Sequence, residues 1–222
     1  DTDIKRLSPN GYLKIVDGGW FSGHTVEFRA DSSGRIERRF WIGSSERPFE
    51  PEGRRWLSDA LPRVIRQTGI GASSRVARFL KAGGPSAVLA EISIIEGSWA
   101  KRLYFGELLK AASLDASTRA RVLSQAGREI DSDFELATLL ISSADQLVAD
   151  DTSRKAYLDA ARSISSDFEL RRVLSSALKT RVASNPGLLA NLLETSQSIG
   201  SDFEEATLLI DVVNAESIDS AA

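Results

Sequence analysis

The 222-residue sequence contains no cysteine, no methionine and a single histidine, His24. Without cysteine, the chain has no disulfide framework, no thiol nucleophile, no cysteine-ligated zinc site and no iron–sulfur cluster. A single histidine excludes a histidine-rich metal site and the H-E-x-x-H motif of metalloproteases. No apolar run approaches the roughly 18 residues that a membrane span needs. We therefore expect no catalytic residue, no metal and no cofactor, and the chain is predicted not to be an enzyme.

The net charge of −3 is the sum of two regions of opposite charge. Residues 1–113 carry a net charge of +5, and residues 114–222 carry −8. All four tryptophans also lie in the first region, namely Trp20, Trp41, Trp56 and Trp99. This asymmetry predicts two differently built parts, a β-containing head over residues 1–70 and a helical array over residues 71–222. The predicted fold class is α+β, mainly α.

The head shows the alternation of apolar and polar residues that is typical of half-buried strands between residues 12 and 42. Turn sequences at residues 17–19 and 31–34 divide this stretch, which predicts a three-stranded antiparallel meander. Apolar residues then recur at helical spacing from Trp56 to Ile65. This helix is expected to cover the sheet, and Pro62 is expected to kink or break it.

The outer face of this sheet carries aromatic and basic side chains. The residues concerned are Tyr12, Lys14, Arg29, Arg39 and Trp41. They are a candidate binding patch, and the alternative is an ordinary solvated face with the tryptophan packed on a neighbouring loop. A second basic stripe, at Arg54, Arg55, Arg63, Arg66, Arg75 and Arg78, is a candidate for nucleic-acid or anionic-lipid binding. Acidic residues are interspersed with it, which favours a solvated face.

A four-residue motif, Ser-Asp-Phe-Glu, recurs three times in the second region. It begins at Ser132, at Ser166 and at Ser201, so the spacing is 34 to 35 residues. A degenerate copy lies one unit upstream, where Ser98 and Trp99 occupy the positions of the aspartate and the phenylalanine. Four units of this length predict an α-solenoid of about four helix–turn–helix repeats.

The motif is also a helix-capping signal. In a capping box, a serine side chain accepts a hydrogen bond from the amide three residues later, and a glutamate there reaches back to the serine amide. The expected caps are Ser132 and Glu135, Ser166 and Glu169, and Ser201 and Glu204. The alternative is that these acids serve acid/base catalysis or bind calcium. Recurrence once per unit favours capping.

The phenylalanine of each motif is predicted to begin an apolar stripe that points into the core. The stripe would continue through Leu140 and Ala144 in one unit and through equivalent residues in the next two. In the last unit, Glu205 replaces an apolar residue, which is typical of a polar terminal repeat. The alternative is an array that continues.

The units have tetratricopeptide length but lack the tryptophan, leucine-glycine and tyrosine of that signature. They resemble short, degenerate HEAT-type helix pairs. The I-x-S-D-F-E-x-x-x-x-L segments, with Lys101–Phe105 and Glu46–Phe49, also resemble a bacterial family over about residues 35–213. Its members carry repeated SD-aromatic-E helices, and some are fused to membrane metallopeptidases of the β-lactam-sensor type. The zinc motif of those enzymes is missing here, so the resemblance implies a sensing or interaction module outside the cytoplasm, in the periplasm.

The leading functional hypothesis is a non-enzymatic module that binds a protein or peptide, because solenoids form extended binding surfaces. The opposite charges of the two regions also allow self-association. A membrane is expected as a partner only through a segment outside this sequence, and nucleic acid is not expected. Two alternatives stay open: an enzyme with a carboxylate and arginine site between sheet and solenoid, and nucleic-acid binding through the arginine-rich first half.

Overall fold

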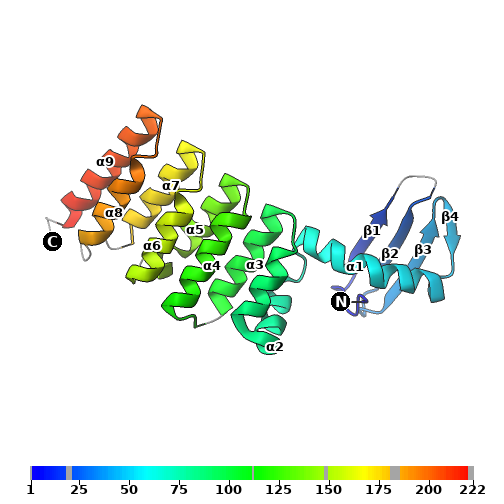
Figure 1. Cartoon of the computed structure of the whole chain (residues 1–222). Helices are drawn as coiled ribbons and strands as arrows, with labels where there is room; N and C mark the ends of the chain where they lie inside the picture. The colour runs from blue at the N-terminus through cyan, green and yellow to red at the C-terminus, as the bar shows by residue number, and fades with distance from the viewer. Residues whose placement is uncertain (1, 19–21, 112, 148–149, 181–185, 220–222) are drawn as a thin grey trace. The chain divides into compact units, whose positions relative to one another are not determined.

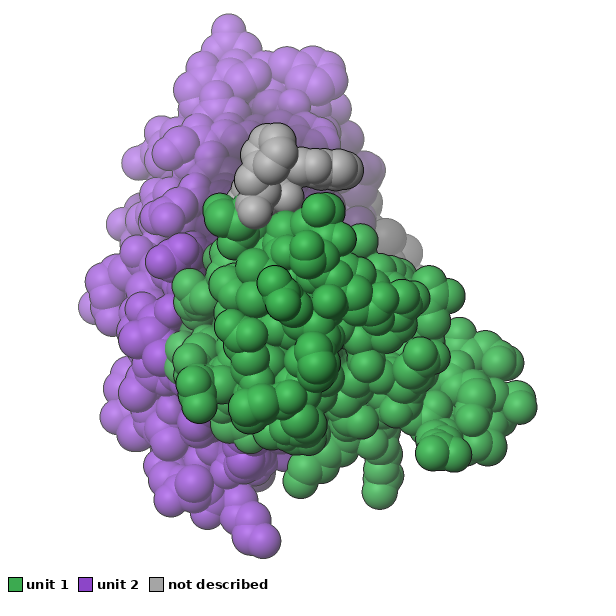
Figure 2. Space-filling model, turned by 90° about the vertical axis from the view of Figure 1, so that its right-hand side faces the viewer, with its two compact units in different colours: residues 1–70 green, residues 71–222 purple. Residues whose placement is uncertain are grey.

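The computed structural model describes residues 2–18, 22–111, 113–147, 150–180 and 186–219. The chain divides into two compact units, Asp1–Ile70 and Gly71–Ala222, which Figure 2 shows in different colours. The first unit holds an antiparallel sheet and the second is made of helices. The predicted fold class, α+β and mainly α, is confirmed.

The sheet of the first unit has four strands in the order β1-β2-β3-β4, each antiparallel to its neighbour (Figure 1). They are β1 (Tyr12–Asp17), β2 (His24–Ala30), β3 (Ile36–Ile42) and β4 (Ser45–Arg47). The expected meander was therefore one strand short. The fourth strand follows a turn at Gly43, which has a φ of 55°. Three residues are too few to show an alternating pattern, so the sequence does not reveal β4.

Helix α1 (Arg54–Thr68) packs its apolar side on one face of this sheet, after the short π-helical segment η1 (Phe49–Gly53). The fully buried core comprises Ile15, Val26, Phe28, Phe40, Leu57 and Leu61. The ring of His24 stacks against those of Phe40 and Trp56, with centroids 5.8 and 5.4 Å away, and these two rings also contact each other at 6.3 Å. Helix α1 continues through Pro62, so the alternative that this residue ends the helix was wrong.

In the described part of the second unit, the helices form four antiparallel pairs. They are α2 (Ala72–Ser93) with α3 (Ser98–Ala111), α4 (Ala116–Glu129) with α5 (Asp133–Leu147), α6 (Asp151–Ala161) with α7 (Asp167–Leu178), and α8 (Pro186–Ser196) with α9 (Asp202–Asp219). First helices pack on first helices and second helices on second helices, so the pairs form a stack (Figure 1). Helix α2 is broken where Gly83 and Gly84 leave the helical conformation. The unit is thus an array of helical repeats.

One continuous apolar core runs through this stack and reaches Leu208 in the last helix. Helices α4 and α6 approach closely where the small residues Gly127 and Ala160 meet. A Cβ atom added to Gly127 would lie only 3.0 Å from the Cα atom of Ala160, so a larger residue does not fit there. The two rings of Tyr104 and Tyr157 are fully buried. Among the described residues, no helix combines the length and the apolarity needed to cross a membrane.

Candidate functional site

The outer face of the sheet brings the predicted patch residues together. Strand pairing sets Tyr12 opposite Arg29, and it sets Arg39 and Lys14 on either side of the central Glu27. The guanidinium of Arg29 lies 4.8 Å from the centre of the Tyr12 ring. The guanidinium of Arg39 lies at the same distance from the ring of Trp41. The patch therefore exists as a cluster of stacked aromatic and cationic groups.

Glu27 occupies the middle of this face and was not part of the prediction. Its carboxylate lies 3.4 Å from the ammonium of Lys14 and 3.8 Å from the guanidinium of Arg29. Desolvation raises the pKa of Glu27, but hydrogen bonds from Tyr12 and Lys14, with the charges of Lys14 and Arg29, outweigh it, and the net pKa is lowered. The acid is thus held ionised among its partners.

The face is balanced in charge, because carboxylates accompany the cations. Arg39 donates two hydrogen bonds to Glu46 on β4, at 2.8 and 2.7 Å. Strand pairing also sets Glu37 opposite Arg29 on the same face. Among the described residues, Glu27, Glu37 and Glu46 thus accompany Lys14, Arg29 and Arg39 on this face, and binding by the patch stays a prediction. A hollow of about 420 Å³ opens beside Trp41, Lys14 and Glu27.

The arginines proposed for nucleic-acid binding do not form a stripe of unpaired charge. Arg54 pairs with Glu50, and Arg63 pairs with Asp17 at 3.1 Å. Arg75 is buried and donates to the carboxylate of Glu91 at 2.6 Å. These pairs neutralise part of the positive charge that binding to phosphate groups requires.

The serine half of the predicted capping box is present in all three motifs. The side-chain oxygens of Ser132, Ser166 and Ser201 accept hydrogen bonds from the amides of Glu135, Glu169 and Glu204, at 3.4, 3.3 and 3.4 Å. Each serine therefore caps the second helix of its unit. A cap satisfies one of the amides that a helix leaves unpaired at its start.

The glutamate half of the prediction was wrong. Glu135 pairs with Arg102 of the preceding unit, and Glu204 pairs with Arg171 of the preceding unit at 2.6 Å. Glu169 pairs with Arg172 on its own helix at 2.7 Å. In the unit that precedes Glu169, Ala137 occupies the position of Arg102 and Arg171. Stacking of the units thus brings an arginine to Glu135 and Glu204, whereas Glu169 finds one on its own helix.

The amides of Ser132 and Ser166 are satisfied by the preceding unit instead. The amide of Ser166 donates to a carboxylate oxygen of Asp133 at 2.8 Å, and the amide of Ser132 donates to the hydroxyl of Ser98 at 3.3 Å. In the last unit, the amide of Gly200 donates to Asp167 at 3.1 Å. The residue after the serine in one motif therefore binds the start of the next motif, so the motif links neighbouring units.

The aromatic residue of each motif is exposed. The side chains of Trp99, Phe134, Phe168 and Phe203 are 47% to 75% exposed. We call these four residues the aromatic ridge. The predicted inward position of the phenylalanine was wrong, whereas Leu140 and Ala144 are buried as predicted. Phe134 and Leu140 are six residues apart, which places them about 120° apart around a helix of 3.6 residues per turn. The buried side of α5 is formed by residues such as Leu136 and Leu140.

The surroundings of the ridge are polar and carry both signs of charge. The guanidiniums of Arg171 and Arg172 lie 5.2 and 5.7 Å from the centre of the Phe168 ring. Trp99, Phe134 and Phe168 each stand next to the serine or aspartate that binds the following unit, so this part of the ridge follows a line of contacts between units. The recurrence of an aromatic residue where capping does not require one is the signal in the sequence that marks this surface.

In the part of the chain that the structure describes, no group of three or more histidine, cysteine, aspartate or glutamate side chains is placed to hold a metal ion. Comparison of the chain with protein-family models, with curated protein sequences and with solved structures gives no match.

Proposed function

We propose that the chain is a non-enzymatic protein-interaction module that binds extended peptide segments along the aromatic ridge. The observation that carries this proposal is the exposure of an aromatic side chain at the same place in every unit. Fully burying an exposed phenylalanine side chain contributes roughly 1.5–3 kcal/mol, so the three partly exposed phenylalanines and Trp99 together represent an unused interaction surface. The core of the stack does not require them, because other residues fill it.

The spacing of the units supports an extended partner. Packed helices lie roughly 8–10 Å apart, which sets the approximate step from one ridge residue to the next. A peptide in the polyproline II conformation has three residues per turn and advances about 3.1 Å per residue, so every third side chain lies on one face about 9 Å further on. The proposed partner is therefore an extended segment with an apolar side chain at every third position.

The chemistry of the acids supports a binding function over a catalytic one. The carboxylates of Asp133 and Asp167 accept hydrogen bonds from backbone amides of the next unit, and Glu135 and Glu204 are held in ion pairs. These contacts give the repeated acids a structural role, which supports a binding function over general acid/base catalysis. The proposal includes the likeness to HEAT-type helix pairs, which is supported by the paired helices and the recurrence at 34 to 35 residues.

The proposal is tested with fluorescent peptides that carry leucine or proline at every third position. Matched peptides carry the same residues at every second position or in scrambled order. We expect the period-three peptide to bind, and the double variant Phe134→Ala/Phe168→Ala to bind it at least tenfold more weakly. Tyr12→Ala is the matched control, since it removes an exposed aromatic residue of the other unit. Equal affinity for all three peptides, or unchanged affinity in the double variant, contradicts the proposal.

A further inference from the structure

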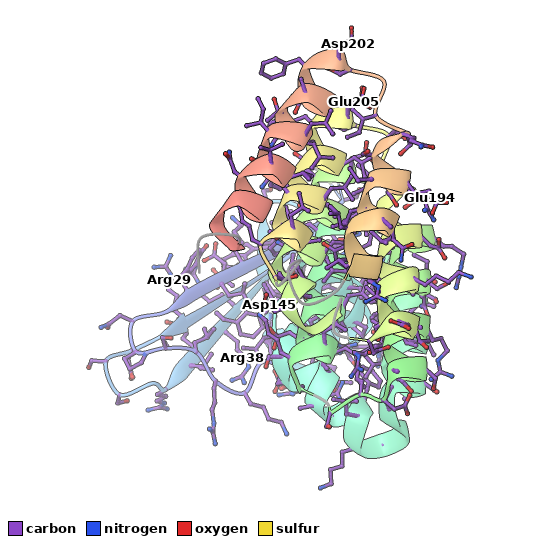
Figure 3. All side chains as sticks on the ribbon, turned by 90° about the vertical axis from the view of Figure 1, so that its left-hand side faces the viewer. Arg29, Arg38, Asp145, Glu194, Asp202 and Glu205 are labelled. Atoms are coloured by element: carbon purple, nitrogen blue, oxygen red, sulfur yellow. The ribbon has the colours of Figure 1, made fainter. Side chains whose placement is uncertain are left out.

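The last helix of the stack exposes an apolar face. Leu209, Ile210 and Val213 of α9 are 46% to 64% exposed. They lie at helical spacing and so share one side of α9. We call these three residues the α9 face. The end of the stack formed by α8 and α9 faces the viewer in Figure 3.

The corresponding residues of the other units lie in interfaces. The motif spacing aligns Leu209 with Leu174 of α7 and Val213 with Leu178, which are no more than 3% exposed. Helix α9 covers them, since α7 and α9 pack side by side. The α9 face is thus the same stacking surface that each second helix offers to the next one. It therefore has the shape and chemistry of a helix-binding surface.

The expectation of a polar terminal repeat does not hold for this face. Glu205 is half buried, and the exposed positions between Ala206 and Val213 are all aliphatic. A helix that packs there would bury the same kind of surface that α9 itself buries on α7.

The residues of the last unit carry charge of one sign, while Arg162 and Arg171 of the preceding unit pair with its Glu194 and Glu204. Residues 182–222 contain seven aspartates and glutamates and no lysine or arginine. Glu194, Asp202 and Glu205 belong to this end and are labelled in Figure 3. Two copies of such a surface repel each other, whereas a helix with lysine or arginine beside its apolar stripe is attracted.

We propose that the α9 face binds an amphipathic helix of another protein, with an aliphatic stripe flanked by lysine or arginine. This helix takes the place that the second helix of a following unit has inside the stack. The binding is of the helix-in-groove kind, in which an apolar stripe supplies affinity. It uses a different surface from the aromatic ridge, and it stands or falls independently of the proposed function.

The test uses the full chain and three synthetic helical peptides of equal length. The first carries a leucine and isoleucine stripe with flanking lysines, the second has the same stripe with flanking glutamates, and the third keeps the lysines but replaces the stripe with alanine. Binding is measured by fluorescence anisotropy at low and at physiological salt. We expect the first peptide to bind at least tenfold more tightly than either of the others, and more weakly as salt rises.

Variants identify the surface. Ile210→Ser/Val213→Ser is expected to weaken binding of the first peptide at least tenfold, and Glu205→Gln to reduce its salt dependence. Ile94→Ser is the matched control, because Ile94 is an exposed aliphatic residue in another repeat of the helical stack. All these side chains except Glu205 are exposed, so folding is retained, which circular dichroism verifies. Phe134→Ala/Phe168→Ala leaves this binding unchanged even though it removes the ridge.

Three results overturn the proposal. The first is unchanged binding in Ile210→Ser/Val213→Ser. The second is equal binding of the lysine-flanked peptide and its alanine-stripe counterpart. The third is self-association of the chain in sedimentation velocity that disappears in the same double variant, because the occupant of the face would then be a second copy.

Discussion

The carboxylate of Asp133 accepts a hydrogen bond of 2.8 Å from the backbone amide of Ser166, which begins the motif of the next unit. The two residues are 33 positions apart in the chain. The same motif therefore starts a helix in its own unit and fastens the unit that follows. These two roles explain why the aspartate recurs with the serine. The aromatic residue that follows the aspartate has no structural role of comparable weight.

The link between Asp133 and Ser166 predicts a stability effect of a single substitution. Asp133→Ala leaves the amide of Ser166 without its carboxylate partner, and this should lower the free energy of unfolding by about 1 kcal/mol, since the site is only half buried. Asp131→Ala, at an exposed residue two positions earlier, is the control and should change stability by less than about 0.5 kcal/mol. Urea unfolding followed by circular dichroism measures both. Equal effects would show that the link contributes nothing.

The buried ion pair of Arg75 and Glu91 predicts a non-additive pair of substitutions. Arg75 donates to Glu91 at 2.6 Å and to the hydroxyl of Tyr104 at 2.6 Å. Glu91→Leu leaves a buried cation without its main carboxylate and should cost about 3 kcal/mol. The double variant Arg75→Met/Glu91→Leu should recover most of that loss, because neither charge remains buried. Thermal unfolding of the four proteins gives the coupling, and additive effects would argue against a tight pair.

Asp150 predicts a dependence of stability on pH. Burial opposes its ionisation, but the amide of Ser153 and the guanidinium of Arg119, at 2.8 and 2.7 Å, outweigh this and lower its pKa to about 2. A depressed pKa in the folded state contributes stability above the unfolded value near 4, and this stability is lost as the pH falls toward 2.

The variant Asp150→Asn should therefore be less stable than the parent by about 1–2 kcal/mol at pH 7, and the difference should shrink between pH 4 and pH 2. Urea unfolding across this range measures it. Asp145→Asn, at an exposed carboxylate, is the control. A difference that is independent of pH would mean that the carboxylate charge does not stabilise the fold.

The position of Phe168 predicts a separation of binding from stability. Phe168→Ala removes a half-exposed ring and its contacts with two arginines, which should lower stability by about 1 kcal/mol. Leu174→Ala, on the buried side of the same helix, should cost about 3 kcal/mol because it opens a cavity in the core. Unfolding by urea ranks the two. If Phe168→Ala proves the more destabilising, the residue belongs to the core and not to a binding surface.

Local signals in the sequence were sufficient for much of the fold. The alternation over residues 12–42 predicted the first three strands, and the recurrence of Ser132, Ser166 and Ser201 predicted the starts of three helices. These features depend on neighbouring residues, whose chemistry determines turns, caps and faces. The strand β4 was missed because it is only three residues long.

The roles that involve distant residues could not be predicted in the same way. Glu135 fits a capping box when only its own motif is considered, yet stacking brings Arg102 to it from the preceding unit. The outer face of the sheet was predicted to be basic, because the sequence alone does not show that Glu27 lies beside Lys14 and that Glu46 lies beside Arg39. The exposure of Phe134 was predictable, since a residue six positions from Leu140 does not share its face.

The central claim is that peptide binds at the aromatic ridge, and fluorine NMR of the chain labelled with 5-fluorotryptophan tests it most directly. Trp99 reports on the ridge, Trp41 on the outer face of the sheet and Trp56 on the core beneath it, while Trp20 lies outside the described residues. Each resonance is assigned by substitution with phenylalanine. On addition of the period-three peptide, the resonance of Trp99 should shift and those of Trp41 and Trp56 should stay in place. Saturable binding that shifts Trp41 and leaves Trp99 unchanged would contradict the account.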